Sequence, residues 1–585
     1  MSLPQADTSA VYLYLNKMFI PDKKKRTFDA IVVGSGISGG WSAKELCEKG
    51  LKTLVLERGR DVKHIVDYPT TMTQPWEFEH RGQLNHDFKK ENPIISKCYA
   101  FYEGTTQFFV KDKEHPYVQE KPFDWIRGYQ VGGKSLMWAR QTQRWSKYDF
   151  EGPARDGFAV EWPVTYDEMA PWYSHVEKFA GISGNKDGLD TLPDGDFLPP
   201  HEMNCVEDYF SQKVAQKYGK DRHVIIGRAA HLTKPNQIHF DQGRAQCQNR
   251  AICERGCPYG GYFSSNASTI PWAMKTGKMT LRTDSVVHSI IYDDKLGKAT
   301  GVRVIDANTK EMTEYYAKII FVNAAAINTN LILLNSTSAR FPNGLGNDSG
   351  VLGKYVAFHN YRARVSGEYE GFLDKTTEGK RPNSPYIPRF RNVLKQETDF
   401  LRGYAAGFGA NRMSWNKNEG MGETLKDNLA KREYGNWSVG SHMMGETIPK
   451  ESNFVALDKT LKDPFGMPQL RISVDYDNND EKMVKDYIEQ MTEMFTMAGF
   501  TNIRANDSKQ PAGLDIHEMG GVRMGKDPKT SMLNGFNQLH ACKNVFVTDG
   551  ACMTSTSTQN PSLTYMAFSA RAVDYAVKEM RKGNL

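Results

Sequence analysis

The pattern of apolar and polar positions is clearest near the N-terminus. The apolar run at residues 29–33 predicts a short buried strand, and the spaced apolar side chains over residues 37–49 predict a helix. A second apolar run at 51–56 predicts another strand. The order strand, helix, strand is typical of an α/β fold built on a parallel sheet.

Strand patterns return after residue 278. Short apolar runs predict strands at 279–282, 286–292, 301–305 and 318–322, with a hairpin at 293–298 and a helix at 328–334. The last strand is expected to rejoin the first sheet.

Residues 356–510 have a different pattern. They alternate in the manner of antiparallel strands at 365–370, 453–457 and 469–474, and they include a long amphipathic helix at 481–497. This segment is expected to form a second domain that faces the substrate.

Three glycines stand between the first strand and the first helix. Gly34, Gly36 and Gly39 fill the pattern G-x-G-x-x-G, and Glu57 ends the second strand, followed by Arg58. In a dinucleotide-binding turn the glycines permit the sharp turn, the approach of a pyrophosphate and close packing of the helix. The acidic residue would accept hydrogen bonds from a ribose hydroxyl. The alternative is a glycine turn without a ligand.

A second glycine pair lies at Gly132 and Gly133, with Ser135 close behind. Such a pair suits close approach of the backbone to a flat or phosphorylated ligand. On its own it is equally compatible with a tight turn.

Length and charge narrow the class of protein. A chain of 585 residues exceeds what one core supports, so two domains are expected. A net charge of +6 on so large a chain does not indicate a nucleic-acid partner, and the basic run at 23–26 is best interpreted as a solvated linker. Apolar runs fall short of a membrane span, and the first residues lack a secretory pattern. We expect a cytoplasmic protein or one exported with a partner.

Three of the eight cysteines are clustered. Cys247, Cys253 and Cys257 are followed by Pro258. Zinc would need a fourth ligand, for which His239 or Cys205 is available in the sequence. An iron–sulfur cluster uses thiolates at such spacings, and three cysteines suit a three-iron cluster. The alternative is three ordinary thiols.

The C-terminal part carries the candidate chemistry. It contains His517, the pair Asp549-Gly550 and, just before the last predicted helix, the pair Asn560-Pro561. The pKa of an imidazole lies near neutrality, which suits a general base. A lone histidine is more often structural, so His517 needs support from its neighbours.

Together these motifs resemble the glucose–methanol–choline (GMC) family of flavin oxidoreductases over nearly the whole chain. The resemblance rests on Gly34–Gly39 with Glu57, Gly132–Ser135, Ala324–Ala326, Gly353 with His359, His517–Gly525, Asp549-Gly550 and Asn560-Pro561. It implies an α/β fold: a Rossmann-like FAD-binding domain interleaved with an antiparallel-sheet substrate-binding domain. The FAD-binding domain would comprise residues 26–160, 246–355 (with the cysteine cluster) and 511–585. The substrate domain would comprise 161–245 and 356–510.

The resemblance also implies roles for single residues. His517 would take the hydroxyl proton of an alcohol while hydride passes to N5 of the flavin, and Asn560 would orient the same oxygen. Contacts to FAD are implied for Gly34, Gly36, Gly39, Glu57, Arg58, Gly133, Ser135, Val287, Ala324, Asp549, Gly550, Asn560 and Pro561. Relatives with covalent FAD have a histidine at the position of Met137, so non-covalent FAD is expected.

The cysteines, together with Trp138 and Trp162-Pro163, are similar to a branch of bacterial sugar dehydrogenases. In this branch a large subunit holds FAD, and a 3Fe–4S cluster accepts electrons from the flavin. The resemblance implies that the ligands of this cluster are Cys247, Cys253 and Cys257. The overall pattern most resembles glucoside 3-dehydrogenase, which implies oxidation of a D-glucoside at C3. The alternatives are gluconate 2-dehydrogenase and FAD glucose 1-dehydrogenase. An oxygen-using pyranose oxidase is a weaker alternative, because such an enzyme would not need the three clustered cysteines.

The same branch implies partners and a location. A small subunit exported by the Tat route is expected, and a cytochrome subunit sometimes follows. No nucleic acid and no direct membrane span are expected. The location would be periplasmic, or at the inner membrane through partner subunits, and cytoplasmic if no partner exists.

Overall fold

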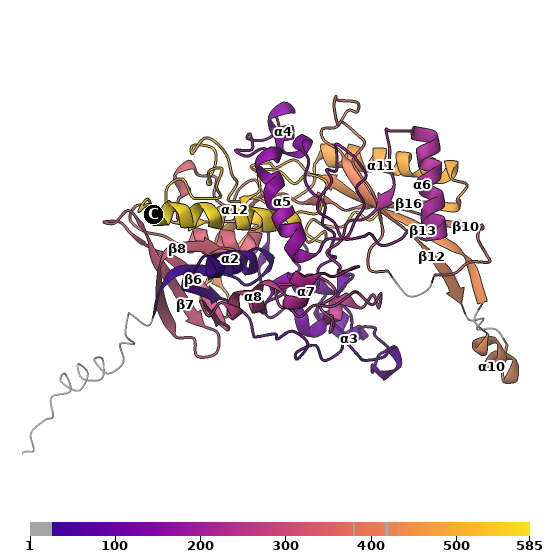
Figure 1. Cartoon of the computed structure of the whole chain (residues 1–585), viewed down its shortest axis with the longest axis horizontal. Helices are drawn as coiled ribbons and strands as arrows, with labels where there is room; N and C mark the ends of the chain where they lie inside the picture. The colour runs from indigo at the N-terminus through magenta and orange to yellow at the C-terminus, as the bar shows by residue number, and fades with distance from the viewer. Residues whose placement is uncertain (1–25, 378–380, 416–419, 432) are drawn as a thin grey trace, which may run out of the picture.

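The structure, a computed structural model, describes residues 26–377, 381–415, 420–431 and 433–585 (Figure 1). Apart from Arg26, the basic run and the segment before it lie outside these residues, so the expectations for them stay predictions. Within the described residues no helix is both long and apolar enough to cross a membrane.

The N-terminal apolar runs form the centre of a mixed sheet. Across this sheet β5 (Met279–Arg282), β2 (Thr53–Leu56), β1 (Thr27–Val33) and β8 (Met312–Val322) run parallel, followed by the antiparallel pair β7 (Lys298–Asp306) and β6 (Ser285–Asp293). The short β17 (Val545–Phe546) pairs in parallel with β8. The predicted strands and hairpin are confirmed, and β8 rejoins β1 as expected.

Helices cover both faces of this sheet. Ala30 and Val32 of β1 pack with α2 (Ile37–Glu48) and α12 (Ser562–Arg581), which lie side by side in Figure 1. The alternate residues of β1, Ile31 and Val33, join a larger core that includes α9 (Ala326–Asn335). Because successive strand residues point to opposite faces, one short strand is buried on both sides. Two more helices pack on this side of the molecule, α5 (Tyr166–Ala180) against α12 and α8 (Thr269–Lys275) against α2.

A second, antiparallel sheet lies at the other end of the molecule (Figure 1). Its order is β16 (Thr501–Asp507), β10 (Ala363–Tyr369), β13 (Glu433–Glu446), β12 (Tyr404–Trp415), β11 (Pro385–Ile387) and β4 (Ile225–Ile226), and β9 (His359–Asn360) pairs with β13. The long helix α11 (Asn478–Met497) and α6 (Cys205–Tyr218) pack on it through a core that is rich in Phe and Met. The strand β4 precedes residues 246–355, the middle segment of the predicted FAD-binding domain, and the other strands of this sheet follow that segment. The observed fold therefore confirms the predicted interleaved fold class.

The two longest strands, β12 and β13, were not expected from the sequence. Both contain glycines, which are rare in strands. Gly407 pairs with His442 across the two strands, and a Cβ on Gly407 would lie 2.1 Å from the His442 ring. The glycine is therefore there to accommodate a ring, which a propensity argument does not detect.

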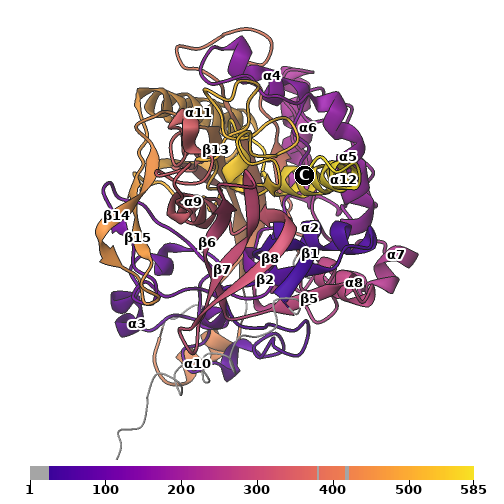
Figure 2. The same ribbon diagram turned by 90° about the vertical axis from the view of Figure 1, so that its left-hand side faces the viewer.

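The strands expected near 453–457 and 469–474 are present but belong elsewhere. They are β14 (Phe454–Lys462) and β15 (Pro468–Ser473), which pair with each other, and β15 also pairs with β3 (Val118–Gln119) in a third, small sheet (Figure 2). The remaining helices are α3 (His86–Glu91), α4 (Lys147–Arg155), α7 (Gln237–Asp241) and α10 (Glu423–Ala430). The assignment of residue ranges to domains stays a prediction.

Candidate active site

A cavity of about 1340 Å³ is lined by residues of both large sheets. It brings together most of the residues singled out in the sequence: Gly34, Gly36, Glu57, Arg58, Gly133, Ser135, Val287, Ala324, His517, Asp549, Gly550 and Asn560. Cys247 also lines it. Gly39, Pro561, Cys253 and Cys257 lie outside this lining. Residues that are far apart in the sequence therefore meet around one space.

The first glycine loop has the shape that a pyrophosphate requires. Gly34 has a φ of +89°, and a Cβ there would lie 2.3 Å from the carbonyl oxygen of Asn323. A Cβ on Gly39 would lie 1.9 Å from the carbonyl oxygen of Gly34, so only glycine fits there. Gly39 therefore packs against the loop and does not line the cavity. A Cβ on Gly36 would meet no described atom within 4 Å. The open space at Gly36, beside the uncapped N-terminus of α2, leaves room and free N–H groups for an anion.

Hydrogen bonds from Ser35 of the first glycine loop, and from Gly59, hold the carboxylate of Glu57 in place. Its Oε2 accepts hydrogen bonds from the Ser35 N–H (3.1 Å) and the Ser35 hydroxyl (2.5 Å), and its Oε1 accepts one from the Gly59 N–H (3.0 Å). Burial raises the pKa of this carboxyl, and the hydrogen bonds oppose that shift. The neighbouring Arg58 lies over the ring of Tyr129, 4.6 Å from its centroid. The contact of Glu57 with a ribose stays a prediction.

The second glycine loop faces the first one. Gly133 begins a short 3-10 helix, Gly133–Leu136, and a Cβ on it would lie 3.3 Å from Cα of Gly36. The Ser135 hydroxyl donates to the carbonyl of Gly132 (2.6 Å) and accepts from the N–H of Ser265 (3.0 Å). Ser135 therefore holds the loop in shape while it lines the cavity.

Asp549 ends the loop after β17. Its carboxylate accepts hydrogen bonds from the Thr329 hydroxyl (2.6 Å) and the Ala551 N–H (3.0 Å). Burial raises its pKa to about 6, and these bonds oppose the shift. The carboxylate fixes the start of the Gly550–Cys552 turn against α9.

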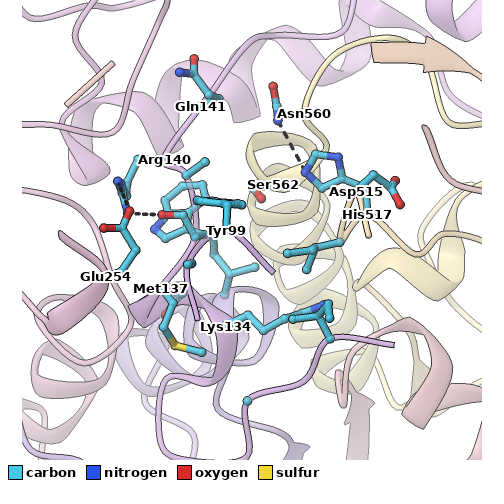
Figure 3. Close-up of a pocket in the computed structure, with 18 of the residues that line it drawn as sticks. Tyr99, Lys134, Met137, Arg140, Gln141, Glu254, Asp515, His517, Asn560 and Ser562 are labelled. Atoms are coloured by element: carbon cyan, nitrogen blue, oxygen red, sulfur yellow. Dashed lines mark hydrogen bonds and ion pairs between the residues drawn. The ribbon is translucent and has the colours of Figure 1, made fainter. Parts of the chain in front are cut away.

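His517 and Asn560 meet inside the cavity (Figure 3). Asn560 Nδ2 lies 3.5 Å from Nε2 of His517. Burial lowers the pKa of His517 well below its usual range, and the charge of Lys134 acts in the same direction. Lys134 itself pairs with Glu518, at 2.9 Å between Nζ and Oε2. The imidazole is therefore neutral, which is the form that accepts a proton.

His359 contacts His517, and sequence reasoning did not predict this contact. Its Nδ1 lies 2.9 Å from Nδ1 of His517, and its backbone N–H donates to Asp515 at 2.8 Å. In the sequence His359 is only one member of a motif, and no spacing rule links two residues that lie 158 positions apart. An antiparallel bridge between Ala357 and Met519 places it beside His517.

The loop that carries Asn560 is held by a buried network of charges. Asp149 accepts hydrogen bonds from the Ser557 hydroxyl (2.8 Å) and the Gln559 amide (3.1 Å) of this loop. Arg389 bridges Asp149 (2.6 Å) and Glu446 (3.1 Å). The side chains of all three charged residues are at most 1% exposed. Buried charges need such pairing, so the loop is tied to α4 and β13 at once.

The cysteine loop forms another part of the cavity wall. Arg140 pairs with Glu254 at 3.0 Å, and the two lie across the cavity from His517 and Asn560 (Figure 3).

The sulfurs of the cysteine loop have separate neighbours. Cys253 Sγ lies 3.8 Å from Nε2 of the buried His231, and Cys257 Sγ accepts from the Gly261 N–H at 3.4 Å. Among the described residues, no set of three ligand atoms within 4.8 Å of one another includes these sulfurs. That spacing does not fit a single zinc ion; ligands of a multi-iron cluster bind different irons and stand farther apart.

Neither fourth ligand suggested by the sequence joins the cysteines as a zinc ligand. The nitrogens of His239 face the Asn236 N–H (3.1 Å) and the Lys178 carbonyl (3.2 Å). Cys205 begins α6 and belongs to the cavity lining and the core of the antiparallel sheet. The zinc alternative is therefore disfavoured.

Family models settle the class of protein. Two models, each described as GMC oxidoreductase, match residues 28–359 and 449–569. The chain is a GMC oxidoreductase. Membership in this family brings FAD as the cofactor, and the glycine loops described above fit it. The enzyme therefore oxidises alcohol or sugar donors.

Characterised relatives of this GMC oxidoreductase match over almost its full length. They include 2-methyl-1,2-propanediol dehydrogenase of Mycolicibacterium austroafricanum (28% identity, 94% of each chain) and the fructose dehydrogenase large subunit of Gluconobacter japonicus (24% identity, 95% of this chain and 98% of the relative). A third is the gluconate 2-dehydrogenase flavoprotein of Pantoea cypripedii (25% identity, 93% of each chain). Among solved structures, pyridoxine 4-oxidase from Mesorbium loti shares the fold (TM-score 0.58, 14% identity, 94% of this chain and 99% of that one). The named substrates differ widely, so family membership alone does not identify the substrate.

Proposed function

We propose that this GMC oxidoreductase is a sugar dehydrogenase that oxidises a secondary hydroxyl, at C3 of a D-glucoside, to the ketone. The observation that carries the proposal is the pairing of a neutral His517 with Asn560 in the cavity that the glycine loops share. When bound, FAD supplies the hydride acceptor at N5. His517 Nε2 takes the hydroxyl proton, and the Asn560 amide donates to the same oxygen and orients it.

The cavity offers an apolar platform of the kind that sugars use. Tyr99 lines the cavity and is 64% exposed, so its ring is open to a ligand. Figure 3 draws it between Arg140 and the His517–Asn560 pair. An aromatic face packs against the C–H face of a sugar ring, and polar side chains such as Gln141 can bind the hydroxyls.

Two paired arginines of the cavity lining favour a neutral sugar over an aldonate. Arg140 pairs with Glu254, and Arg381 pairs with Glu207 at 2.8 Å. A guanidinium that already has a carboxylate partner binds a carboxylate substrate less strongly than a guanidinium without one. The relative named for gluconate keeps gluconate 2-dehydrogenase as the second candidate.

Cys247, Cys253 and Cys257 are proposed to hold a 3Fe–4S cluster. Support comes from their spacing and from Cys247, which lies in the wall of the same cavity. The cluster would supply a one-electron route from the cofactor to an external acceptor. A small partner subunit, with or without a cytochrome, and a periplasmic or inner-membrane location follow from this proposal, and relatives described as a large subunit and a flavoprotein are consistent with it.

The absorbance spectrum of the purified holoenzyme under argon tests the proposal. Methyl α-glucoside has a blocked anomeric carbon, so bleaching of the flavin bands by this sugar requires oxidation at a hydroxyl other than the anomeric one. Bleaching by gluconate or glucose alone would replace the C3 assignment by one of the alternatives. Replacing Cys253 by Ser should remove iron while FAD stays bound, and unchanged iron content would end the cluster assignment.

A further inference from the structure

We propose that His359 is a positioning residue that holds His517 in the tautomer with its proton on Nδ1. Nε2 of His517 then faces the cavity as the proton acceptor. The inference rests on the proposed function, because it concerns the base of that reaction. In this proposal His359 acts through His517 and does not contact the substrate.

The hydrogen bonds of His359 fix its own proton first. Nε2 of His359 lies 3.2 Å from the carbonyl oxygen of Thr556 and 3.1 Å from that of Ser557. Carbonyl oxygens only accept, so this nitrogen carries the proton. Burial lowers the pKa of His359 to about 4, which keeps the ring neutral. A neutral imidazole has a single N–H, and Nδ1 of His359 is therefore an acceptor.

The contact between the two rings then fixes the proton of His517. The two Nδ1 atoms are 2.9 Å apart, and the rings are perpendicular, with centroids at 5.0 Å. One nitrogen of this pair must donate, and His359 Nδ1 has no proton to give. The proton is on Nδ1 of His517, and Nε2 keeps its lone pair. The Asn560 amide nitrogen, 3.5 Å away, is a donor directed at the same atom.

The neutral partner has a consequence for the reaction. In a Ser-His-Asp triad a carboxylate holds the histidine in one tautomer and also stabilises its protonated form. An imidazole acceptor does the first without adding a negative charge. The titratable groups around the pair are Lys134, which is paired with Glu518, and Asp515, for which burial raises the pKa of the carboxyl to about 7. His517 is thus oriented for proton transfer and is not held in the protonated form between turnovers.

Two variants of the holoenzyme separate positioning from packing. His359→Asn keeps a carbonyl oxygen near the place of Nδ1, whereas His359→Leu removes the acceptor and fills similar space. Flavin reduction by methyl α-glucoside under argon should fall about 10²-fold in H359L and stay within about fivefold of wild type in H359N, with little change in the half-saturating sugar concentration. The acid limb of the pH profile should move in H359L alone. Equal rates in the two variants would overturn the inference.

A second readout needs no variant of His359 and no turnover. In protein labelled with ¹⁵N-histidine, long-range ¹H–¹⁵N spectra show which ring nitrogen carries the proton, and H517Q identifies the signals of His517. The expected pattern is the Nδ1–H tautomer, and an Nε2–H pattern in the wild type would contradict the proposal. One equivalent of Zn²⁺ is added as a control, because His359, Asp515 and His517 place ligand atoms within 4.8 Å of one another. Displacement of the His517 proton by Zn²⁺ would assign the contact to a metal site instead.

Failure of the inference differs from failure of the proposed function. If H517A is slow and H359L is normal, His517 remains the base and only the role of His359 is lost. If H517A reduces its flavin at the wild-type rate, the base assignment itself fails.

Discussion

The cofactor side and the substrate side of the cavity are built by different means. On the cofactor side, defined by the Gly34–Gly39 and Gly132–Ser135 loops, backbone atoms and small residues make the surface, and close contacts explain Gly34 and Gly39. On the substrate side, defined by β12, β13 and the 556–560 loop, buried ion pairs between distant residues hold the surface in place. Local rules therefore describe the first side, and only the tertiary structure describes the second.

The largest effect is expected where the two sides meet. Replacing His517 by Ala removes the proton acceptor, so flavin reduction by sugar should slow about 10³-fold while FAD stays bound. Anaerobic stopped-flow absorbance measures the rate, and the flavin spectrum of the resting protein is the control. Reduction near the wild-type rate would show that another group accepts the proton.

The next effect tests the buried charges of the substrate side. Arg389→Met leaves Asp149 and Glu446 without this partner, which should cost about 3–5 kcal/mol and release the loop of Asn560. Arg391→Met is the matched control, because Arg391 pairs with Asp486 near the surface, and it should cost about 1 kcal/mol. Thermal unfolding of both variants measures the difference. Equal losses of Tm would mean that burial of the network does not matter.

A smaller effect tests the cofactor side. Gly39→Ala places a Cβ against the carbonyl oxygen of Gly34 and should cost about 1–3 kcal/mol through overpacking. Gly36→Ala meets no described atom within 4 Å, so it should keep the stability of the apoprotein and weaken FAD binding. Thermal unfolding of the apoprotein and titration with FAD separate the two. A G36A variant that binds FAD as the wild type does would place the pyrophosphate elsewhere.

The smallest effect concerns the sugar platform. Tyr99→Ala should raise KM for methyl α-glucoside about five- to tenfold by removing an aromatic face, and Tyr99→Phe should change it less than twofold. Steady-state kinetics with an artificial acceptor give KM and kcat for both. If Y99F is as impaired as Y99A, the hydroxyl and not the ring face binds the sugar.

The same contrast explains how much the sequence revealed. The turn at Gly34–Gly39 and the helix α2 follow from local patterns, and the structure contains them within a residue or two of the predicted bounds. The Asn560-Pro561 pair and His517 could be proposed because a family resemblance linked them. The strands β12 and β13 were missed, because Gly407 makes room for a ring that lies across the strand pair.

Long-range contacts account for the rest. His359 and His517 touch because the chain at Ala357 pairs with the chain at Met519, and Asp149 reaches the Asn560 loop from a helix more than 400 residues earlier in the chain. Neither contact leaves a spacing or a period in the sequence. The cysteine loop is the intermediate case: its spacing suggested a metal site, and the structure adds its place in the cavity wall and a neighbour, His231.

We propose that His517 takes the proton of the C3 hydroxyl of a D-glucoside while Asn560 orients that oxygen. The most direct measurement is the rate of flavin reduction by methyl α-D-glucoside carrying deuterium at C3, compared with the same sugar deuterated at C2. The account predicts a primary isotope effect for the C3-labelled sugar and none for the C2-labelled one. An isotope effect at C2 alone, or no bleaching of the flavin by either sugar, would contradict it.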